Sequence, residues 1–191
     1  MYKFIEKVFS KTEIDYLKDI VKENETAKLY SIRSDTGRLA MPLTSLKPEI
    51  IAKVQEIIQN IYGKDYKINA VLFQRYKLEY GFPNLKPHTD NYISQVVFDY
   101  QIESNKKWDL VVEGDSISLN DNDAVVFEGE KDVHWRNPVY FKSNEYVSMI
   151  NFNAVDKQHW SNFTKKDPVG PEERQKIYQR IVEKWRDHYP F

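Results

Sequence analysis

A strand-like stretch at residues 94–102 reads Ser94-Gln95-Val96-Val97-Phe98-Asp99-Tyr100-Gln101-Ile102. Six further runs of similar character lie at residues 70–76, 108–112, 116–119, 124–127, 133–139 and 146–152. Turn-forming residues separate several of these runs, as in the Asn- and Asp-rich segment at residues 120–123. Closely spaced short strands are typical of antiparallel sandwiches and barrels. We therefore expect a β core at residues 67–153.

Helical patterns lie on both sides of this β region. The segment Ser10-Lys11-Thr12-Glu13 has the sequence of a capping box and precedes an apolar stripe with helical spacing. A second amphipathic helix is expected to begin near Pro48 and to stop at Gly63. We expect one domain over residues 1–191, composed of a helical buttress at 10–63, the β core at 67–153 and a C-terminal helix at 171–188.

The composition excludes several classes of protein. The 28 Lys and Arg nearly balance the 29 Asp and Glu, giving a net charge of -1 that does not suit a general nucleic-acid binder. No apolar run approaches the roughly 20 residues that span a bilayer, and the N-terminus does not resemble a secretory signal. The chain has no Cys, which excludes disulfides and thiolate sites. We expect a cytoplasmic protein without nucleic-acid or membrane partners.

A metal site is the strongest chemical candidate. His88 and Asp90 are two residues apart, so on an extended segment both side chains point to the same face. His134 lies in a later strand that a folded sheet can bring beside this pair. Two imidazoles and one carboxylate suit a non-haem Fe(II) site with open positions, whereas a closed zinc site normally needs a fourth protein ligand. Taken alone, a His-x-Asp triplet is common and carries no such meaning.

Several motifs together resemble the Fe(II)/2-oxoglutarate dioxygenases of the prolyl-4-hydroxylase type. Arg75-Tyr76 and Gly81 precede a segment that reads Lys86-Pro87-His88-Thr89-Asp90-Asn91, as a strand and a loop precede the His-x-Asp of that family. The segments at residues 119–127 and 134–139 resemble the turn, the apolar strand and the distal His of the second half of its core. The resemblance covers residues 67–153.

This resemblance implies a fold and an activity. The fold is a double-stranded β-helix, a cupin-like jelly roll with flanking helices. Fe(II) would be held by His88, Asp90 and His134, and 2-oxoglutarate and molecular oxygen would be co-substrates. The family couples decarboxylation of 2-oxoglutarate to oxidation of a substrate C–H bond. Related halogenases have a small residue in place of the carboxylate, so Asp90 favours hydroxylation.

The chain departs from the family at the anchor for the distal 2-oxoglutarate carboxylate. The family usually has Arg or Lys about ten residues after the distal His, where this chain has Asn144, or Tyr146 if the following strand is aligned. A buried carboxylate nevertheless needs a charged partner. The anchor is therefore expected elsewhere in the chain.

Three basic residues are candidates for this anchor. Arg136 ranks first because it lies two residues after His134 and so shares its strand face; Arg75 ranks second and Lys142 third. Alternatively, Arg136 forms an ion pair with a core acid or holds a substrate carboxylate. Tyr76 either donates a hydrogen bond to the co-substrate or packs in the core.

The substrate-binding candidates are Arg33, Arg38 and Tyr92. The two Arg lie on short strands near a Gly turn, where they would bind an acidic substrate or remain solvated hairpin charges. Tyr92 follows His88 and Asp90 at the same spacing of two residues, so on an extended segment it would share their face and line the pocket. We expect a small molecule such as an amino acid or metabolite as substrate, with a peptidyl side chain second. The alternatives are a jelly-roll module that binds a ligand or metal without catalysis and an iron oxygenase that does not use 2-oxoglutarate.

Overall fold

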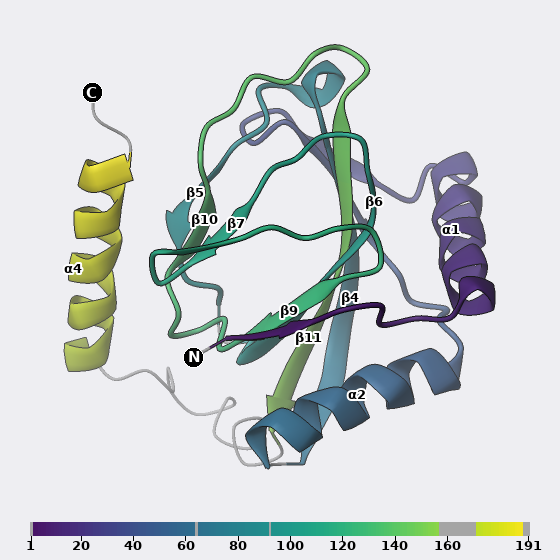
Figure 1. The fold of residues 1–191 in the computed structure, drawn as a ribbon, viewed down its shortest axis with the longest axis horizontal. Helices are drawn as coiled ribbons and strands as arrows, with labels where there is room; N and C mark the ends of the chain where they lie inside the picture. Colours follow the sequence, from purple (N-terminus) through teal and green to yellow (C-terminus); the bar gives the residue numbers. More distant parts are fainter. Residues whose placement is uncertain (1, 64, 92, 157–170, 189–191) are drawn as a thin grey trace.

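Two antiparallel sheets form the centre of the molecule (Figure 1). The structure, a computed structural model, describes residues 2–63, 65–91, 93–156 and 171–188. Within these residues the larger sheet has the strand order β1 (Lys3–Ile5), β9 (Ala124–Phe127), β6 (Val96–Ser104), β11 (Tyr146–Asp156), β4 (Tyr66–Lys77), β3 (Arg38–Pro42) and β2 (Ser31–Arg33). The smaller sheet has the order β5 (Leu85–His88), β10 (His134–Arg136), β7 (Leu110–Val112) and β8 (Asp115–Ile117).

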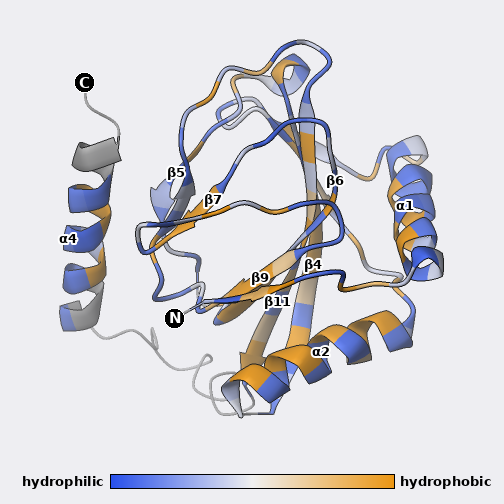
Figure 2. Cartoon of the chain, in the orientation of Figure 1, coloured by the Kyte–Doolittle hydropathy of each residue, from blue (hydrophilic) through white to orange (hydrophobic). Residues whose placement is uncertain are grey.

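Two helices cover the outer face of the larger sheet. Helix α1 (Lys11–Thr26) begins at the predicted capping box, in which the Ser10 side chain accepts from the Glu13 amide and the Glu13 carboxylate accepts from the Ser10 amide. Helix α2 (Pro48–Tyr62) ends at Gly63, whose φ of 63° is left-handed and suits glycine. Figure 2 shows the apolar side of α2 turned toward the sheet.

Strand alternation gives the larger sheet an apolar outer face and an inner face on which polar and apolar residues are mixed. On β4, β6 and β11, Phe73, Phe98 and Phe152 pack with the helices in the main core. Their neighbours in sequence point the other way, toward the smaller sheet. The residues of these three strands that line a cavity on this side include Gln74, Tyr76, Asp99, Met149, Asn151 and Asn153. The polar residues on this inner face are unusual for a core position and mark the region where ligands can bind.

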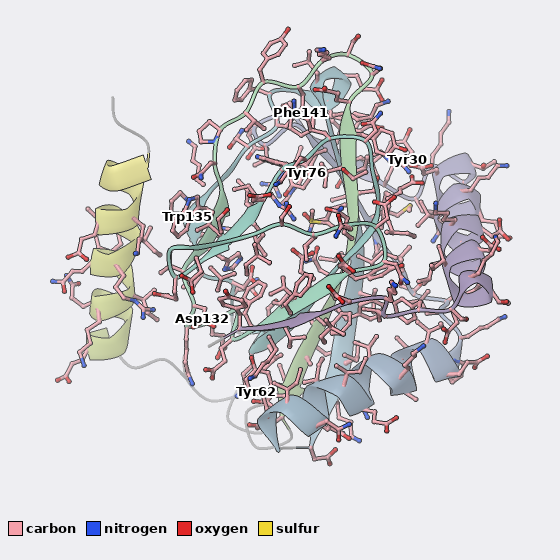
Figure 3. The ribbon with its side chains drawn as sticks, in the orientation of Figure 1. Tyr30, Tyr62, Tyr76, Asp132, Trp135 and Phe141 are labelled. Atoms are coloured by element: carbon pink, nitrogen blue, oxygen red, sulfur yellow. The ribbon has the colours of Figure 1, made fainter. Side chains whose placement is uncertain are left out.

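Helix α4 (Pro171–His188) packs against the outer side of the smaller sheet. Its Ile181 contacts a buried cluster of Val111, Val133 and Trp135. Figure 3 shows Trp135 on the side that faces α4, while Tyr76 lies in the space between the two sheets. Trp135 thus points away from the cavity, opposite to its neighbour His134.

The predicted jelly-roll core with flanking helices is confirmed, with two strands added. The short strands β1 and β5 were not expected; β1 pairs with β9 and covers its open edge, and β5 pairs with β10. With three residues in β1 and four in β5, neither strand is long enough for its alternation to be recognised without its partner. Among the described helices, none has both the length and the apolar character needed to cross a lipid bilayer.

Candidate metal centre and adjoining cavity

His88, Asp90 and His134 come together at one end of the smaller sheet. His88 ends β5 and His134 begins β10, and the two are direct partners in the antiparallel register. Asp90 follows β5, where its backbone amide donates to the Gly129 carbonyl at 2.7 Å. One potential ligand atom from each residue lies within 4.8 Å of the other two. This spacing is compact enough for one ion to bind all three side chains.

Hydrogen bonds orient both imidazoles in the same way. The Nδ1 of His88 lies 2.7 Å from the Lys86 carbonyl, and the Nδ1 of His134 lies 3.0 Å from the Asp132 carbonyl. A carbonyl can only accept, so each Nδ1 carries the proton and each Nε2 keeps a free lone pair. These Nε2 atoms lie 3.9 Å and 3.6 Å from the Asp90 carboxylate oxygens. Backbone acceptors of this kind are the usual support of metal-binding histidines.

Burial sets the protonation states that a metal requires. It lowers the pKa of His134 to about 4, and burial and the neighbouring His134 lower the pKa of His88 to about 4. Burial raises the pKa of Asp90 to about 6, although the positive charge of Arg38 acts to lower it. At neutral pH the site therefore contains two neutral imidazoles and one carboxylate, which are the forms that bind a divalent cation. The donor set fits Fe(II).

The three residues line a cavity of about 360 Å³ between the sheets. Leu85, Val97, Leu110 and Phe127 give it apolar walls, and the Phe127 ring lies 4.7 Å from the His134 ring. Its other walls are mostly polar and come mainly from β3, β4, β6 and β11 and from the segment between β5 and β6. A small number of polar groups in a partly apolar cavity is typical of a small-molecule site.

A chain of hydrogen bonds crosses the polar wall. The Arg38 Nη1 donates to the Gln74 Oε1 at 2.8 Å, and the Gln74 Nε2 donates to the Asn151 Oδ1 at 2.8 Å. The Asn151 Nδ2 then donates to the Asp99 Oδ1 at 3.0 Å. The Tyr76 hydroxyl, which also lines the cavity, donates to the Gln74 Oε1 at 3.3 Å. Each side chain in this network therefore constrains the position of the next.

Arg136 lies beyond this wall and does not line the cavity. It is fully buried, donates from Nη1 to the Trp108 carbonyl, and places Nη2 3.7 Å from the Asp99 Oδ2. Its guanidinium also stacks over the Trp108 ring, 5.3 Å from the centroid. Of the alternatives considered for Arg136, the observed contacts are those of an ion pair with a core acid.

The other predicted anchors lie away from the cavity. Arg75 is on the opposite face of β4 from Tyr76, where it pairs with Glu25 and, at 3.2 Å, with Glu103. Lys142 is exposed in the segment before β11. The alternation of side chains along β4 explains the placement of Arg75, because Tyr76, its neighbour, faces inward.

The substrate candidates divide in the same way. Arg38 lines the cavity, whereas Arg33 is exposed on β2 and pairs with Asp35 at 3.3 Å. Tyr92 lies outside the described residues. Sequence reasoning did not single out Gln74, Asn151 and Asp99 as site residues. Each of these residues is a polar position within an otherwise apolar strand. That pattern points to a site only when it is known which face of the strand turns inward.

Solved structures place the fold of the chain in a known structural class. The sequence matches no family model and no curated protein. In three dimensions, however, the chain has the fold of the 2-oxoglutarate- and Fe(II)-dependent oxygenases, the double-stranded β-helix predicted from its motifs.

Three solved structures illustrate the likeness. The carbocyclase SnoK from nogalamycin biosynthesis is 11% identical, with a TM-score of 0.65 over 90% of each chain. A prolyl-4-hydroxylase from Pseudomonas putida is 10% identical, with a TM-score of 0.61 over 82% of this chain and 92% of that one. A prolyl hydroxylase from Trichoplax adhaerens, in complex with a peptide fragment of the hypoxia inducible factor oxygen degradation domain, is 12% identical, with a TM-score of 0.60 over 84% and 86% of the two chains.

Proposed function

We propose that the protein is a non-haem oxygenase that uses Fe(II), 2-oxoglutarate and molecular oxygen. The observation that carries the proposal is the convergence of two free Nε2 atoms and one carboxylate at a cavity. The fold, which this chain shares with 2-oxoglutarate- and Fe(II)-dependent oxygenases, supports the same conclusion. With three protein ligands, positions on the metal remain for the oxo acid and for oxygen.

The protein residues would bind and orient the reactants. His88, Asp90 and His134 would hold the iron, and the Lys86 and Asp132 carbonyls would keep the two imidazoles in the tautomer that binds it. When bound, iron and 2-oxoglutarate supply the activation of oxygen and the oxidation of a substrate C–H bond. The Phe127 ring beside His134 and the other apolar side chains of the cavity would limit the access of water to the metal.

The proposed reaction is hydroxylation of an unactivated carbon in a small molecule such as an amino acid or metabolite. The cavity volume of about 360 Å³ lies within the usual range for small-molecule sites. A peptidyl side chain is the second candidate, since one structural neighbour was solved with a peptide. We further propose that residues 1–191 act as a single catalytic domain.

Anaerobic titration of the protein with Fe(II) and then 2-oxoglutarate tests the proposal. We expect a weak visible charge-transfer band that needs both components, and succinate formation after oxygen is admitted. Iron binding without a response to the oxo acid would favour an oxygenase that draws its electrons from the substrate. Failure to bind iron would favour a binding module without catalysis.

A further inference from the structure

Arg38 provides a positive charge in the cavity wall. It is the one Lys or Arg among the cavity-lining residues that the structure describes. It lies opposite Tyr76 in the register of β3 and β4, so both side chains project from the same face of the sheet. The half-buried Arg38 forms no ion pair with any residue in the described ranges.

The hydrogen bonds of Arg38 leave one edge of its guanidinium without a partner in the described residues. Nη1 donates to the Gln74 Oε1 at 2.8 Å and to the Tyr76 hydroxyl at 3.3 Å. Nε is buried without a hydrogen-bond partner, and Nη2 donates to no group within the described part of the chain. The N–H groups of Nε and Nη2 point along the same edge, which is the geometry that binds the two oxygens of a carboxylate.

The surrounding side chains hold this guanidinium in place. Gln74, which accepts from Arg38, is itself fixed by its bond to Asn151, and Asn151 is fixed by its bond to Asp99. Asp99 is paired with the buried Arg136, so it does not offer a free charge to Arg38. The result is a preorganised cation that forms no ion pair within the described residues, and Asp90, the acid whose charge it meets, belongs to the proposed metal site.

The charge of the cavity suits a dianion. Fe(II) bound by one aspartate and two neutral imidazoles would keep one net positive charge, and Arg38 adds a second. A 2-oxo acid with a second carboxylate would neutralise both charges, one at the metal and one at Arg38. The last strand, β11, offers no cation for this purpose, because its cavity-lining residues are Met149, Asn151 and Asn153.

We propose that Arg38, on β3, binds the distal carboxylate of 2-oxoglutarate, with Gln74 and Tyr76 holding its guanidinium in position. This inference rests on the proposed function. It assigns Arg38 to the co-substrate, and removes Arg136, Arg75 and Lys142 from that role. Selectivity for a dicarboxylic oxo acid is the property that Arg38 confers.

Binding measurements with two oxo acids test the assignment. Full-length protein loaded anaerobically with Fe(II) is titrated with 2-oxoglutarate and with 2-oxopentanoate, which has the same chain length but lacks the distal carboxylate. The charge-transfer band reports binding without turnover. We compare the natural protein with Arg38→Gln, Arg38→Lys and the control Arg33→Gln, since Arg33 lies outside the cavity on the neighbouring strand.

We expect Arg38→Gln to lower the affinity for 2-oxoglutarate about tenfold to hundredfold. The affinity for 2-oxopentanoate should be unchanged. Arg38→Lys should keep part of the preference, because it retains the charge and loses the two-pronged geometry. It also provides a folded variant if the neutral one is unstable. Arg33→Gln should bind both acids like the natural protein.

Two results would overturn the assignment while leaving the proposed function intact. Unchanged 2-oxoglutarate affinity in Arg38→Gln would mean that Arg38 does not bind the co-substrate and can instead bind a substrate carboxylate. An equal loss for both oxo acids would mean that Arg38 acts through the metal site. A natural protein that binds Fe(II) but gives no band with either acid would instead overturn the proposed function together with this inference.

Discussion

His88 and His134 are direct cross-strand partners in the pair β5–β10, and their ring centroids lie 4.3 Å apart. Residues that face each other in an antiparallel pair project from the same side of the sheet. The position of one imidazole therefore depends on the register that holds the other. The smaller sheet therefore positions the candidate metal centre, since it holds both imidazoles and Asp90 follows its strand β5.

Replacing His134 by Ala should abolish most metal binding. Loss of supporting interactions around a ligand typically lowers metal affinity about tenfold to hundredfold, so loss of a ligand should lower it at least as much. The measurement is titration of the metal-free protein with Fe(II) or Mn(II), combined with the rise in melting temperature on metal addition. Lys142→Ala is the control, since Lys142 is exposed and away from the cavity. Normal affinity in the His134 variant would remove this residue from the ligand set.

Below about pH 6, metal affinity should fall as the pH is lowered, because the metal competes with one proton for Asp90. Burial raises the pKa of Asp90 to about 6 and lowers the pKa of His88 and His134 to about 4. Above pH 6 all three ligands already have their metal-binding form. Below it a proton must leave Asp90 for each ion bound, so affinity should fall about tenfold per pH unit.

Mn(II) titrations between pH 5 and 7.5 would measure this slope. Asp90→Asn should bind weakly and show little pH dependence over the same range, because both histidines stay neutral there. A steeper fall that begins near pH 6.5 and persists in the Asn variant would show that the imidazoles titrate normally, contrary to the prediction.

Gly129 should be required for the position of Asp90. A Cβ at residue 129 would lie 2.5 Å from the Ser94 carbonyl oxygen, 2.8 Å from the Asp90 Oδ2 and 2.8 Å from the Val97 Cγ2. Gly129→Ala should therefore displace the carboxylate and lower metal affinity about tenfold, with a stability loss of about 1–3 kcal/mol. Gly63→Ala is a matched control, because it costs about 1 kcal/mol through its left-handed backbone and lies far from any such contact. Equal metal affinity in the two Ala variants would refute the steric argument.

Local signals in the sequence were sufficient for much of the fold. The cap at Ser10 and the stop at Gly63 were predictable because each depends on residues within one turn of the helix. The strands β6 and β9 were visible from their apolar runs. The spacing of His88 and Asp90 likewise placed both side chains on one face before any partner strand was known.

The assignment of the basic residues required the three-dimensional arrangement. Strand parity predicted that Arg136 shares the face of His134, yet it could not reveal that Asp99 and Trp108, from distant segments, enclose its guanidinium. Parity also separates Arg75 from Tyr76, but which of the two faces inward depends on where the helices pack. Long-range packing, which no local pattern encodes, therefore selects Arg38 as the cavity cation.

The ion pair of Asp99 and Arg136 should be important for stability as well as for the shape of the cavity. Both side chains are buried, and burial raises the pKa of Asp99 to about 6 despite the adjacent guanidinium. Asp99→Ala would leave Arg136 in the core without its carboxylate, so we expect a loss of about 3–5 kcal/mol in the free energy of unfolding, measured with urea. The double variant Asp99→Leu, Arg136→Met replaces both charges by apolar side chains and should recover most of this loss. Because Asp99 also fixes Asn151 and through it Gln74, the double variant should still bind 2-oxoglutarate less tightly than the natural protein. If Asp99→Ala were as stable as the natural protein, Arg136 would not depend on this carboxylate. If the double variant bound the oxo acid with full affinity, the hydrogen-bond network through Asn151 and Gln74 would not be needed to position Arg38.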